Sequence, residues 1–219
     1  MDSFDRELVK RALAEDIGSG DATSLALIPT STTARAAILA REPLTVAGLA
    51  QTEMCFSEID DTIKFDRTTE DGQSLEAEAI LLRLEGPAQS ILASERTALN
   101  FLQRLSGIAT ITTQYREAIE DTGAQLLDTR KTTPGWRTLE KHAVACGGGT
   151  NHRMGLHDMV LIKENHIRAA GGVKHKRCVL TCAHASTRPT VFLVRCSLAQ
   201  HATQAGHRLA RESAGNVAG

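Results

Sequence analysis

The fold is decided by residues 126–166. Three parts of this stretch carry the pattern: LLDTRKTTPG at 126–135, GGGTNHR at 147–153 and MVLIKENH at 159–166. The apolar runs at 124–127 and 159–162 have the length and composition of buried strands. A helical pattern at 137–145 separates them and stops at three glycines. The order strand, helix, strand predicts the βαβ unit of a parallel sheet.

Charged side chains follow both predicted strands directly. Arg130 and Lys131 come after the first strand, and Lys163 comes after the second. Because such sheets bind ligands at the carboxyl ends of their strands, these three side chains are expected to meet at one rim. The Gly-rich loop should bring His152 and Arg153 near the same rim. Arginine grips carboxylates and phosphates with paired hydrogen bonds and lysine adds a point charge, so the pattern predicts a strongly anionic substrate.

Each of these motifs also has a purely structural interpretation. Residues 128–135 fit a solvated strand-to-helix loop, which often carries charge. The glycines at 147–149 fit a helix C-cap as well as a close approach to a ligand, and no Gly-Lys-Ser/Thr follows them as in a Walker loop. Arg96 beside Glu95 fits an exposed pair on a long helix. Local sequence leaves these alternatives open.

The histidines and cysteines of this region do not have the spacing of a structural zinc site. No His-x-x-x-His or Cys-x-x-Cys pair occurs among His142, Cys146, His152, His157 and His166. We therefore predict no metal ion held by a dedicated set of protein ligands.

The first third of the chain mixes strands and helices without βαβ regularity. Helices are expected at 4–15, 48–59, 90–105 and 108–121, and strands at 33–40, 62–66 and 78–84. Gly107 is expected to separate the last two helices. This order predicts an N-terminal α/β sandwich.

Composition narrows the class of protein. The 219 residues carry a net charge of −1, which gives no general attraction to nucleic acid or membranes. The first residues are charged and form no signal-peptide core, and no apolar run is long enough to cross a bilayer. Five cysteines without regular spacing favour a reducing compartment. These features predict a cytoplasmic protein that binds neither nucleic acid nor membrane.

Residues 174–219 differ in composition from the rest of the chain. They hold seven Lys and Arg residues but one acid, Glu212, and three of the five cysteines together with half of the eight histidines. The only apolar run of strand length is TVFLV at 190–194. We predict an atypical basic, Cys/His-rich tail that is frameshifted or poorly ordered.

The motifs DTRKTTPG, GGGTNHRMGLHD and VLIKENHI resemble those of the quinolinate phosphoribosyltransferase family. The resemblance extends from LVKRALAEDIGSGDATS at 8–24 through ERTALNFLQRLSGIAT at 95–110 to about residue 172. The ModD-like proteins share much of this pattern and are the nearest alternative family.

The resemblance implies a fold and a reaction. The fold is an α/β sandwich domain followed by an open α/β barrel. The reaction transfers phosphoribose from phosphoribosyl pyrophosphate to quinolinate and yields nicotinate mononucleotide, pyrophosphate and CO₂ in NAD synthesis. It also implies Mg²⁺ accompanying the pyrophosphate and a homodimer or larger homo-oligomer with shared active sites.

The resemblance further implies roles for individual residues. Its cationic pocket corresponds to Arg130, Lys131, His152, Arg153 and Lys163, with Lys131 and Lys163 as the catalytic pair. Thr129 corresponds to a backbone and hydroxyl contact with substrate. Arg96 corresponds to an arginine that a neighbouring subunit donates to quinolinate.

The chain departs from the family after Gly171 and Gly172. The family continues with EVEV-like and LLDN-like strands whose acids lie in the active site, and neither motif is found in this chain. The expected organisation is therefore an N-terminal sandwich domain at 1–105, a partial barrel at 106–173 and the tail at 174–219. The alternatives to the enzyme are an inactive truncated remnant and a ModD-like protein with another substrate. For the expressed chain we expect poor solubility and no measurable phosphoribosyl transfer.

Overall fold

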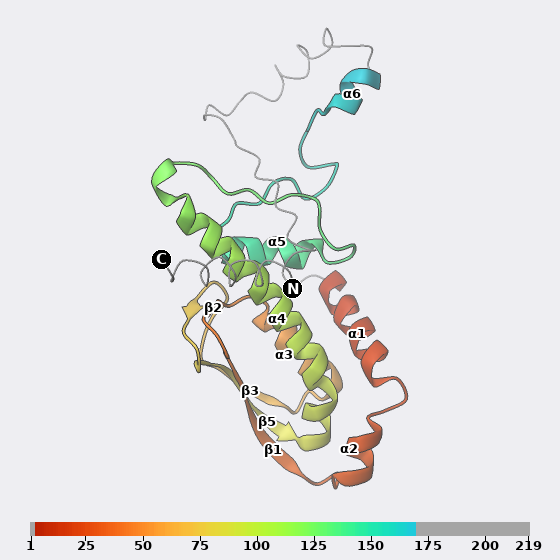
Figure 1. The fold of residues 1–219 in the computed structure, drawn as a ribbon. Helices are drawn as coiled ribbons and strands as arrows, with labels where there is room; N and C mark the ends of the chain where they lie inside the picture. Colours follow the sequence, from red (N-terminus) through yellow and green to blue (C-terminus); the bar gives the residue numbers. More distant parts are fainter. Residues whose placement is uncertain (1–2, 170–219) are drawn as a thin grey trace, which may run out of the picture.

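The computed structural model describes residues 3–169, and the predictions for the tail at 174–219 lie outside them. The chain first forms α1 (Ser3–Ile17) and α2 (Ala22–Leu27), then β1 (Thr33–Leu39), β2 (Leu44–Thr45), α3 (Leu49–Ile59), β3 (Lys64–Arg67), β4 (Ser74–Leu75) and β5 (Ile80–Pro87). The helices α4 (Ala88–Ala118), α5 (Arg137–Cys146) and α6 (Glu164–Ala169) follow, with a short 3₁₀ turn, η1 (Glu120–Thr122), after α4. Figure 1 shows α3 and α4 side by side with the sheet at one end of the pair and α5 near the other.

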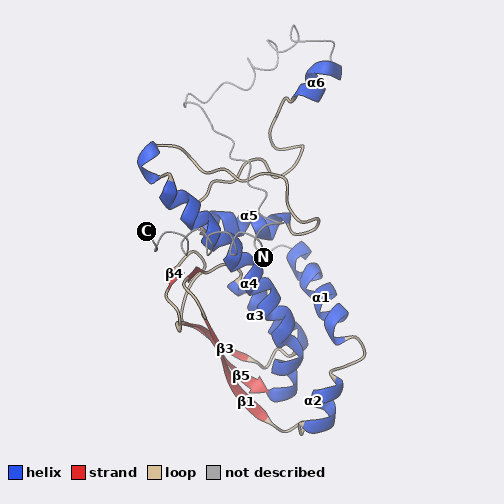
Figure 2. Cartoon of the chain, in the orientation of Figure 1, coloured by secondary structure: helices blue, strands red, loops and turns tan. Residues whose placement is uncertain are grey.

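The main sheet has three antiparallel strands in the order β1-β5-β3, and β2 pairs with β4 in a separate two-stranded ribbon (Figure 2). Exposure alternates along β1, as expected of a strand with one face on a core. The opposite face carries charged cross-strand pairs, Arg35 with Glu85 and Arg83 with Asp66. The predicted α/β class and N-terminal sandwich are thereby confirmed.

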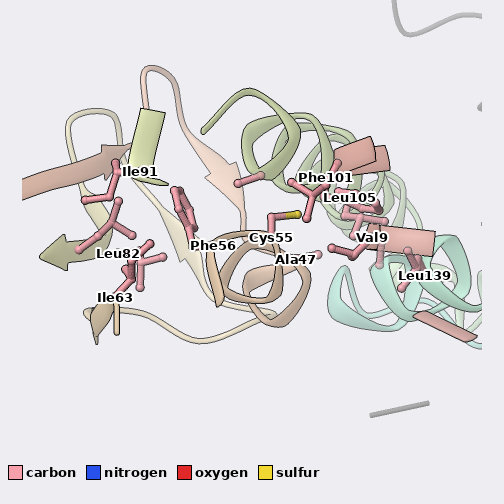
Figure 3. Packing of buried hydrophobic residues seen from close by; sticks show 14 of the residues in the cluster. Val9, Ala47, Cys55, Phe56, Ile63, Leu82, Ile91, Phe101, Leu105 and Leu139 are labelled. Carbon is pink, nitrogen blue, oxygen red and sulfur yellow. The ribbon is translucent and has the colours of Figure 1, made fainter. Parts of the chain in front are cut away.

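One apolar core joins the sheet to the helices. It contains Phe56 of α3, Leu82 of β5, Phe101 and Leu105 of α4, and Leu139 of α5 (Figure 3). All five side chains are at most 2% exposed. This core includes Leu139 of α5, the helix within residues 126–166. That helix therefore packs into the same core as the N-terminal sheet.

The helix α4 runs without interruption through Gly107, so the prediction of two helices separated there is wrong. A glycine in a helix costs only about 1 kcal/mol relative to alanine. The flanking Leu105, Ser106 and Ala109 are all buried, and their packing outweighs that cost. The predicted domain boundary at residues 105 and 106 falls inside this helix and stays a prediction.

The predicted strand at 159–162 is absent from the described part of the chain, where Val160 is 64% exposed. Instead, Leu127 forms a parallel bridge with Thr150, and Thr150 exchanges backbone hydrogen bonds with Leu126 and Asp128. An apolar run forms a strand only where a neighbouring segment pairs with its backbone N–H and C=O groups. The run at 124–127 pairs with Thr150, which lies shortly after α5, and not with residues 159–162. The βαβ connection is therefore shorter than predicted.

Among residues 3–169, no helix combines the length and the hydropathy that a bilayer span requires.

Candidate active site

The carboxylate of Asp128 organises the polar end of the βαβ connection. Its Oδ1 accepts hydrogen bonds from Lys141 Nζ at 2.5 Å and from the backbone N–H of His152 at 2.7 Å. Lys141 Nζ also donates to the His152 carbonyl at 2.9 Å. Only 6% of the Asp128 side chain and 1% of the Lys141 side chain are exposed. This buried ion pair joins the end of the apolar run at 124–127, α5 and the loop after the glycines.

Asn151 completes the same network. With its amide oriented so that both groups are satisfied, its nitrogen donates to Asp128 Oδ2 and to the Lys141 carbonyl, each at 2.9 Å. Both carboxylate oxygens of Asp128 are then occupied by donors within the protein. A buried carboxylate with this many donors is a structural anchor, and its charge is already balanced.

The loop at 129–135 is held from the helix side by Glu140, which is buried in α5. Its Oε2 accepts the Thr133 backbone N–H at 3.1 Å, and its Oε1 accepts Arg104 Nη2 at 2.7 Å. Arg104 also donates to the Thr133 hydroxyl and lies 5.3 Å above the Trp136 ring. Trp136 in turn stacks on Phe101 with a centroid distance of 4.7 Å. The loop that carries Arg130 and Lys131 is thus fixed to α4 and α5.

The loop at 151–158 is fixed by side chains that bind its backbone. Arg137 Nη1 donates to the Met154 carbonyl at 3.2 Å, and Arg153 Nη1 donates to the Met159 carbonyl at 3.0 Å. Asp158 accepts the backbone N–H groups of Met154 and Gly155, which lowers the pKa of its carboxyl. The loop therefore has a defined path past the Asp128 network.

The three glycines at 147–149 serve the packing of α5 against α4. A Cβ on Gly147 would lie 2.4 Å from the Ala109 carbonyl oxygen, and one on Gly149 would lie 2.7 Å from Val144 Cγ1. Gly148 has φ +80°, a conformation that side chains rarely adopt. Of the two interpretations left open above, the described residues support the helix C-cap.

Five of the predicted site residues lie on the two anchored loops. Thr129 uses its hydroxyl to accept the Lys131 backbone N–H at 3.1 Å, and the side chain of Lys131 is exposed. Arg130 and His152 are half-buried, and Arg153 is 7% exposed. Through Asp128, which precedes Thr129 and binds the His152 backbone, the structure brings the two loops together.

The other two predicted residues lie elsewhere. Lys163 directly precedes α6, which stands apart from α5 in Figure 1. Arg96 is exposed on α4, more than two turns before Arg104. The roles assigned to all seven residues stay predictions.

Lys141, Glu140 and Arg104 were missed as supports of the site. A usable signal was present in α5, where Glu140 and Lys141 stand directly beside the core position Leu139. A charged residue next to a core position on a short helix can itself become buried. A buried charge is costly unless an oppositely charged group pairs with it. For Lys141 that partner is Asp128, which directly follows the apolar run at 124–127.

A sequence model for the quinolinate phosphoribosyl transferase N-terminal domain matches residues 21–106, and one for the C-terminal domain matches residues 108–210. The chain belongs to the quinolinate phosphoribosyltransferase family. The C-terminal match extends beyond the described residues. Both domain descriptions agree with the family that the motifs at 128–135 and 147–158 resemble.

Named relatives of this family are similar over most of the chain. It is 47% identical over 169 residues to quinolinate phosphoribosyltransferase [decarboxylating] 2b, mitochondrial, of Nicotiana tabacum, covering 77% of this chain and 48% of the relative. It is 42% identical over 168 residues to the probable nicotinate-nucleotide pyrophosphorylase [carboxylating] of Bacillus subtilis, covering 77% of this chain and 58% of the relative. The chain spans about half the length of the curated relatives it matches.

Solved structures of the family share the fold. The nicotinate-nucleotide pyrophosphorylase of Francisella tularensis superposes with a TM-score of 0.74 at 40% identity, covering 81% of this chain and 64% of that one. NadC of Streptococcus pyogenes gives 0.76 at 39% identity, covering 84% and 65%.

Proposed function

We propose that the anchored loops of this chain bind quinolinate and phosphoribosyl pyrophosphate, and that the chain serves the family reaction. Phosphoribose passes from phosphoribosyl pyrophosphate to quinolinate, and nicotinate mononucleotide, pyrophosphate and CO₂ are released in NAD synthesis. Both sequence models and the tobacco relative are named for quinolinate, which favours this substrate over that of a ModD-like protein.

One observation carries the proposal. Arg130 Nε and Arg153 Nε are both buried, and neither has a hydrogen-bond partner among residues 3–169. A buried guanidinium donor left unpaired is costly, so such a group is usually paired by a ligand, an ion or water. An anion with several oxygens satisfies guanidinium donors best, because it accepts paired hydrogen bonds. Quinolinate has two carboxylates, and the second substrate has phosphates.

The chemistry suits a site made of fixed positive charge. The pyridine nitrogen of quinolinate attacks the anomeric carbon of ribose as the bond to pyrophosphate breaks, so the leaving group takes the electron pair. The ring nitrogen is then cationic, and the carboxylate on the adjacent ring carbon leaves as CO₂. The electron pair of the broken carbon–carbon bond stays on that ring carbon, which then takes up a proton. We assign stabilisation of the departing charge to Lys131 and Lys163, and substrate placement to Arg130, His152 and Arg153, since such a reaction depends on positioning and charge stabilisation.

The described residues fit Mg²⁺ that arrives with the pyrophosphate group. Asp128, the buried carboxylate between the two loops, has both oxygens occupied by Lys141, His152 and Asn151. The carboxylates of Glu140 and Asp158 also accept hydrogen bonds from donors within the protein. Magnesium bound mainly by phosphate oxygens needs no dedicated protein cage. When bound, the ion would reduce the negative charge of the leaving pyrophosphate.

We further propose a cytoplasmic homo-oligomer in which Arg96 completes the site of a neighbouring subunit. Support for a contact with a neighbouring subunit comes from α4, where both Arg96 and the apolar Leu92 are exposed to solvent. Support for a reducing compartment comes from Cys55 and Cys146, which form no disulfide within residues 3–169. The tobacco relative is named as mitochondrial and the Arabidopsis thaliana relative as chloroplastic, whereas the name of the Bacillus subtilis relative gives no organelle.

The test is a product assay on the expressed chain with quinolinate, phosphoribosyl pyrophosphate and Mg²⁺. Nicotinate mononucleotide that requires both substrates, and that disappears in Lys131→Ala, supports the full proposal and overturns the expectation of no measurable transfer by this chain. Saturable quinolinate binding without product identifies the non-catalytic remnant considered above. A folded chain with neither product nor quinolinate binding contradicts the proposal.

A further inference from the structure

A second polar cluster lies away from the Asp128 network. It consists of Asp71, in the turn between β3 and β4, and of His142 and Cys146 on α5. One ligand atom from each side chain lies within 4.8 Å of the other two. His142 Nε2 is 3.1 Å from Asp71 Oδ2 and 3.4 Å from Cys146 Sγ. The two α5 residues are four positions apart and therefore share one face of the helix.

The same nitrogen of His142 faces both partners. In a nucleophile–histidine–carboxylate triad the two partners use opposite ring nitrogens, so this arrangement does not activate Cys146 in that way. The three ligand atoms instead lie within 4.8 Å of one another. With zinc bonds of ~2.0–2.3 Å, neighbouring ligand atoms of a tetrahedral site lie about 3.3–3.8 Å apart. The two observed distances are close to that spacing.

The carboxylate of the cluster is oriented in advance by the backbone. Asp71 Oδ2 accepts the Gly48 N–H and Oδ1 accepts the Leu49 N–H, each at 3.1 Å, at the start of α3. Supporting hydrogen bonds of this kind fix the ligands of metal sites and raise affinity. The Asp71 side chain is 21% exposed and that of His142 is 51% exposed, so solvent has access to the cluster.

We infer that Asp71, His142 and Cys146 form a zinc site whose fourth ligand is water. Zinc accepts thiolate, imidazole and carboxylate ligands together, whereas Mg²⁺ takes oxygen ligands, which separates this site from the ion that accompanies pyrophosphate. Bound zinc would connect the turn after β3 to α5 and so join the N-terminal sheet region to the helix that supports the Asp128 network. The inference does not depend on the proposed function. The inference replaces the prediction that no metal ion is held by a dedicated set of protein ligands. That prediction rested on His-His and Cys-Cys spacing, which cannot detect a His and a Cys on one helix combined with a carboxylate from a distant turn.

The test measures zinc bound per chain by equilibrium dialysis of the full-length protein. Because the tail contains further cysteines and histidines, two double variants are compared with the unmodified chain. His142→Gln with Cys146→Ser should lose one equivalent of zinc, while Cys178→Ser with Cys182→Ser should keep the equivalent bound at the proposed site. An unchanged zinc content in the first variant overturns the inference.

A spectroscopic measurement guards against a variant that loses zinc by misfolding. Co²⁺ added in place of zinc should give the visible bands of tetrahedral coordination and a sulfur-to-cobalt charge-transfer band. In Cys146→Ser with unchanged far-UV circular dichroism, the charge-transfer band assigned to the site should disappear, while the Cys178→Ser, Cys182→Ser variant keeps it. Persistence of that band in folded Cys146→Ser overturns the inference as well.

Discussion

Lys141 Nζ lies 2.5 Å from Asp128 Oδ1, and both side chains are almost completely buried. The two residues are thirteen positions apart, and the pair closes the connection from the apolar run at 124–127 through α5. The same carboxylate receives the backbone N–H of His152. One ion pair therefore positions both loops that carry the predicted anion-binding residues.

Replacing Lys141 by Met should destabilise the protein strongly. It would leave the Asp128 charge buried without its ionic partner, and breaking a buried pair in this way costs about 3–5 kcal/mol. Lys10→Met is the matched control, because Lys10 is 52% exposed and lies 3.7 Å from Glu58. The control should change the free energy of unfolding by less than about 1 kcal/mol. Urea unfolding of both variants checks this, and equal effects would show that the buried pair has no special role.

Gly147→Ala and Gly107→Ala should have opposite effects. A methyl group at Gly147 meets the Ala109 carbonyl and Thr112, so overpacking should cost about 1–3 kcal/mol. Gly107 is in α4, and an added Cβ there would have nothing within 4 Å. Alanine at this position should therefore raise the free energy of unfolding by about 0.5–1 kcal/mol. Thermal unfolding midpoints should shift in opposite directions. A neutral Gly147→Ala would refute the packing account of the three glycines.

Cys55 should resist alkylation while Cys146 reacts. Cys55 is fully buried, and burial raises the pKa of its thiol to about 12, so little thiolate forms at pH 8. Cys146 is half-buried at the exposed end of α5. Iodoacetamide treatment of the zinc-free folded chain, followed by peptide mass spectrometry, should modify Cys146 before Cys55. Modification of Cys55 at the same rate would mean that the core opens readily.

Arg96 should act across subunits. In a full-length relative that carries this N-terminal region, Arg96→Ala and Lys131→Ala should each be inactive alone, because they disable different halves of a shared site. Mixing the two variants should restore part of the activity in mixed oligomers. Confirmed mixed oligomers without any recovery would argue against shared sites.

The sequence alone indicated α1, α3, β1, β3 and β5 of the N-terminal region, but not α2, β2 or β4. Periodicity identified α1, α3 and α5 to within a few residues, since their apolar faces pack on one core. It failed at Gly107, because the burial of neighbouring residues outweighs the preference of a single glycine. It also failed at 159–162, where a strand requires partners that local composition does not reveal.

The candidate site was only partly predictable for a similar reason. The cations of the loop at 128–135 stand out because they follow an apolar run directly. The supports do not stand out, since Lys141 and Arg104 look like ordinary charged residues of helices. Their roles depend on contacts with Asp128 and Glu140 that form only when the helices pack. The same holds for the meeting of Asp71 with His142.

The central claim is that Arg130, whose buried Nε has no hydrogen-bond partner among residues 3–169, binds an anionic substrate. Calorimetric titration of quinolinate into the chain tests it most directly, with Arg130→Ala as the variant and Arg35→Ala, from an exposed pair on the sheet, as the control. Loss of a charged partner for a carboxylate should cost Arg130→Ala about 2–5 kcal/mol of binding free energy. Arg35→Ala should bind quinolinate as the unmodified chain does. Equal affinity of the Arg130→Ala variant and the unmodified chain would contradict the account.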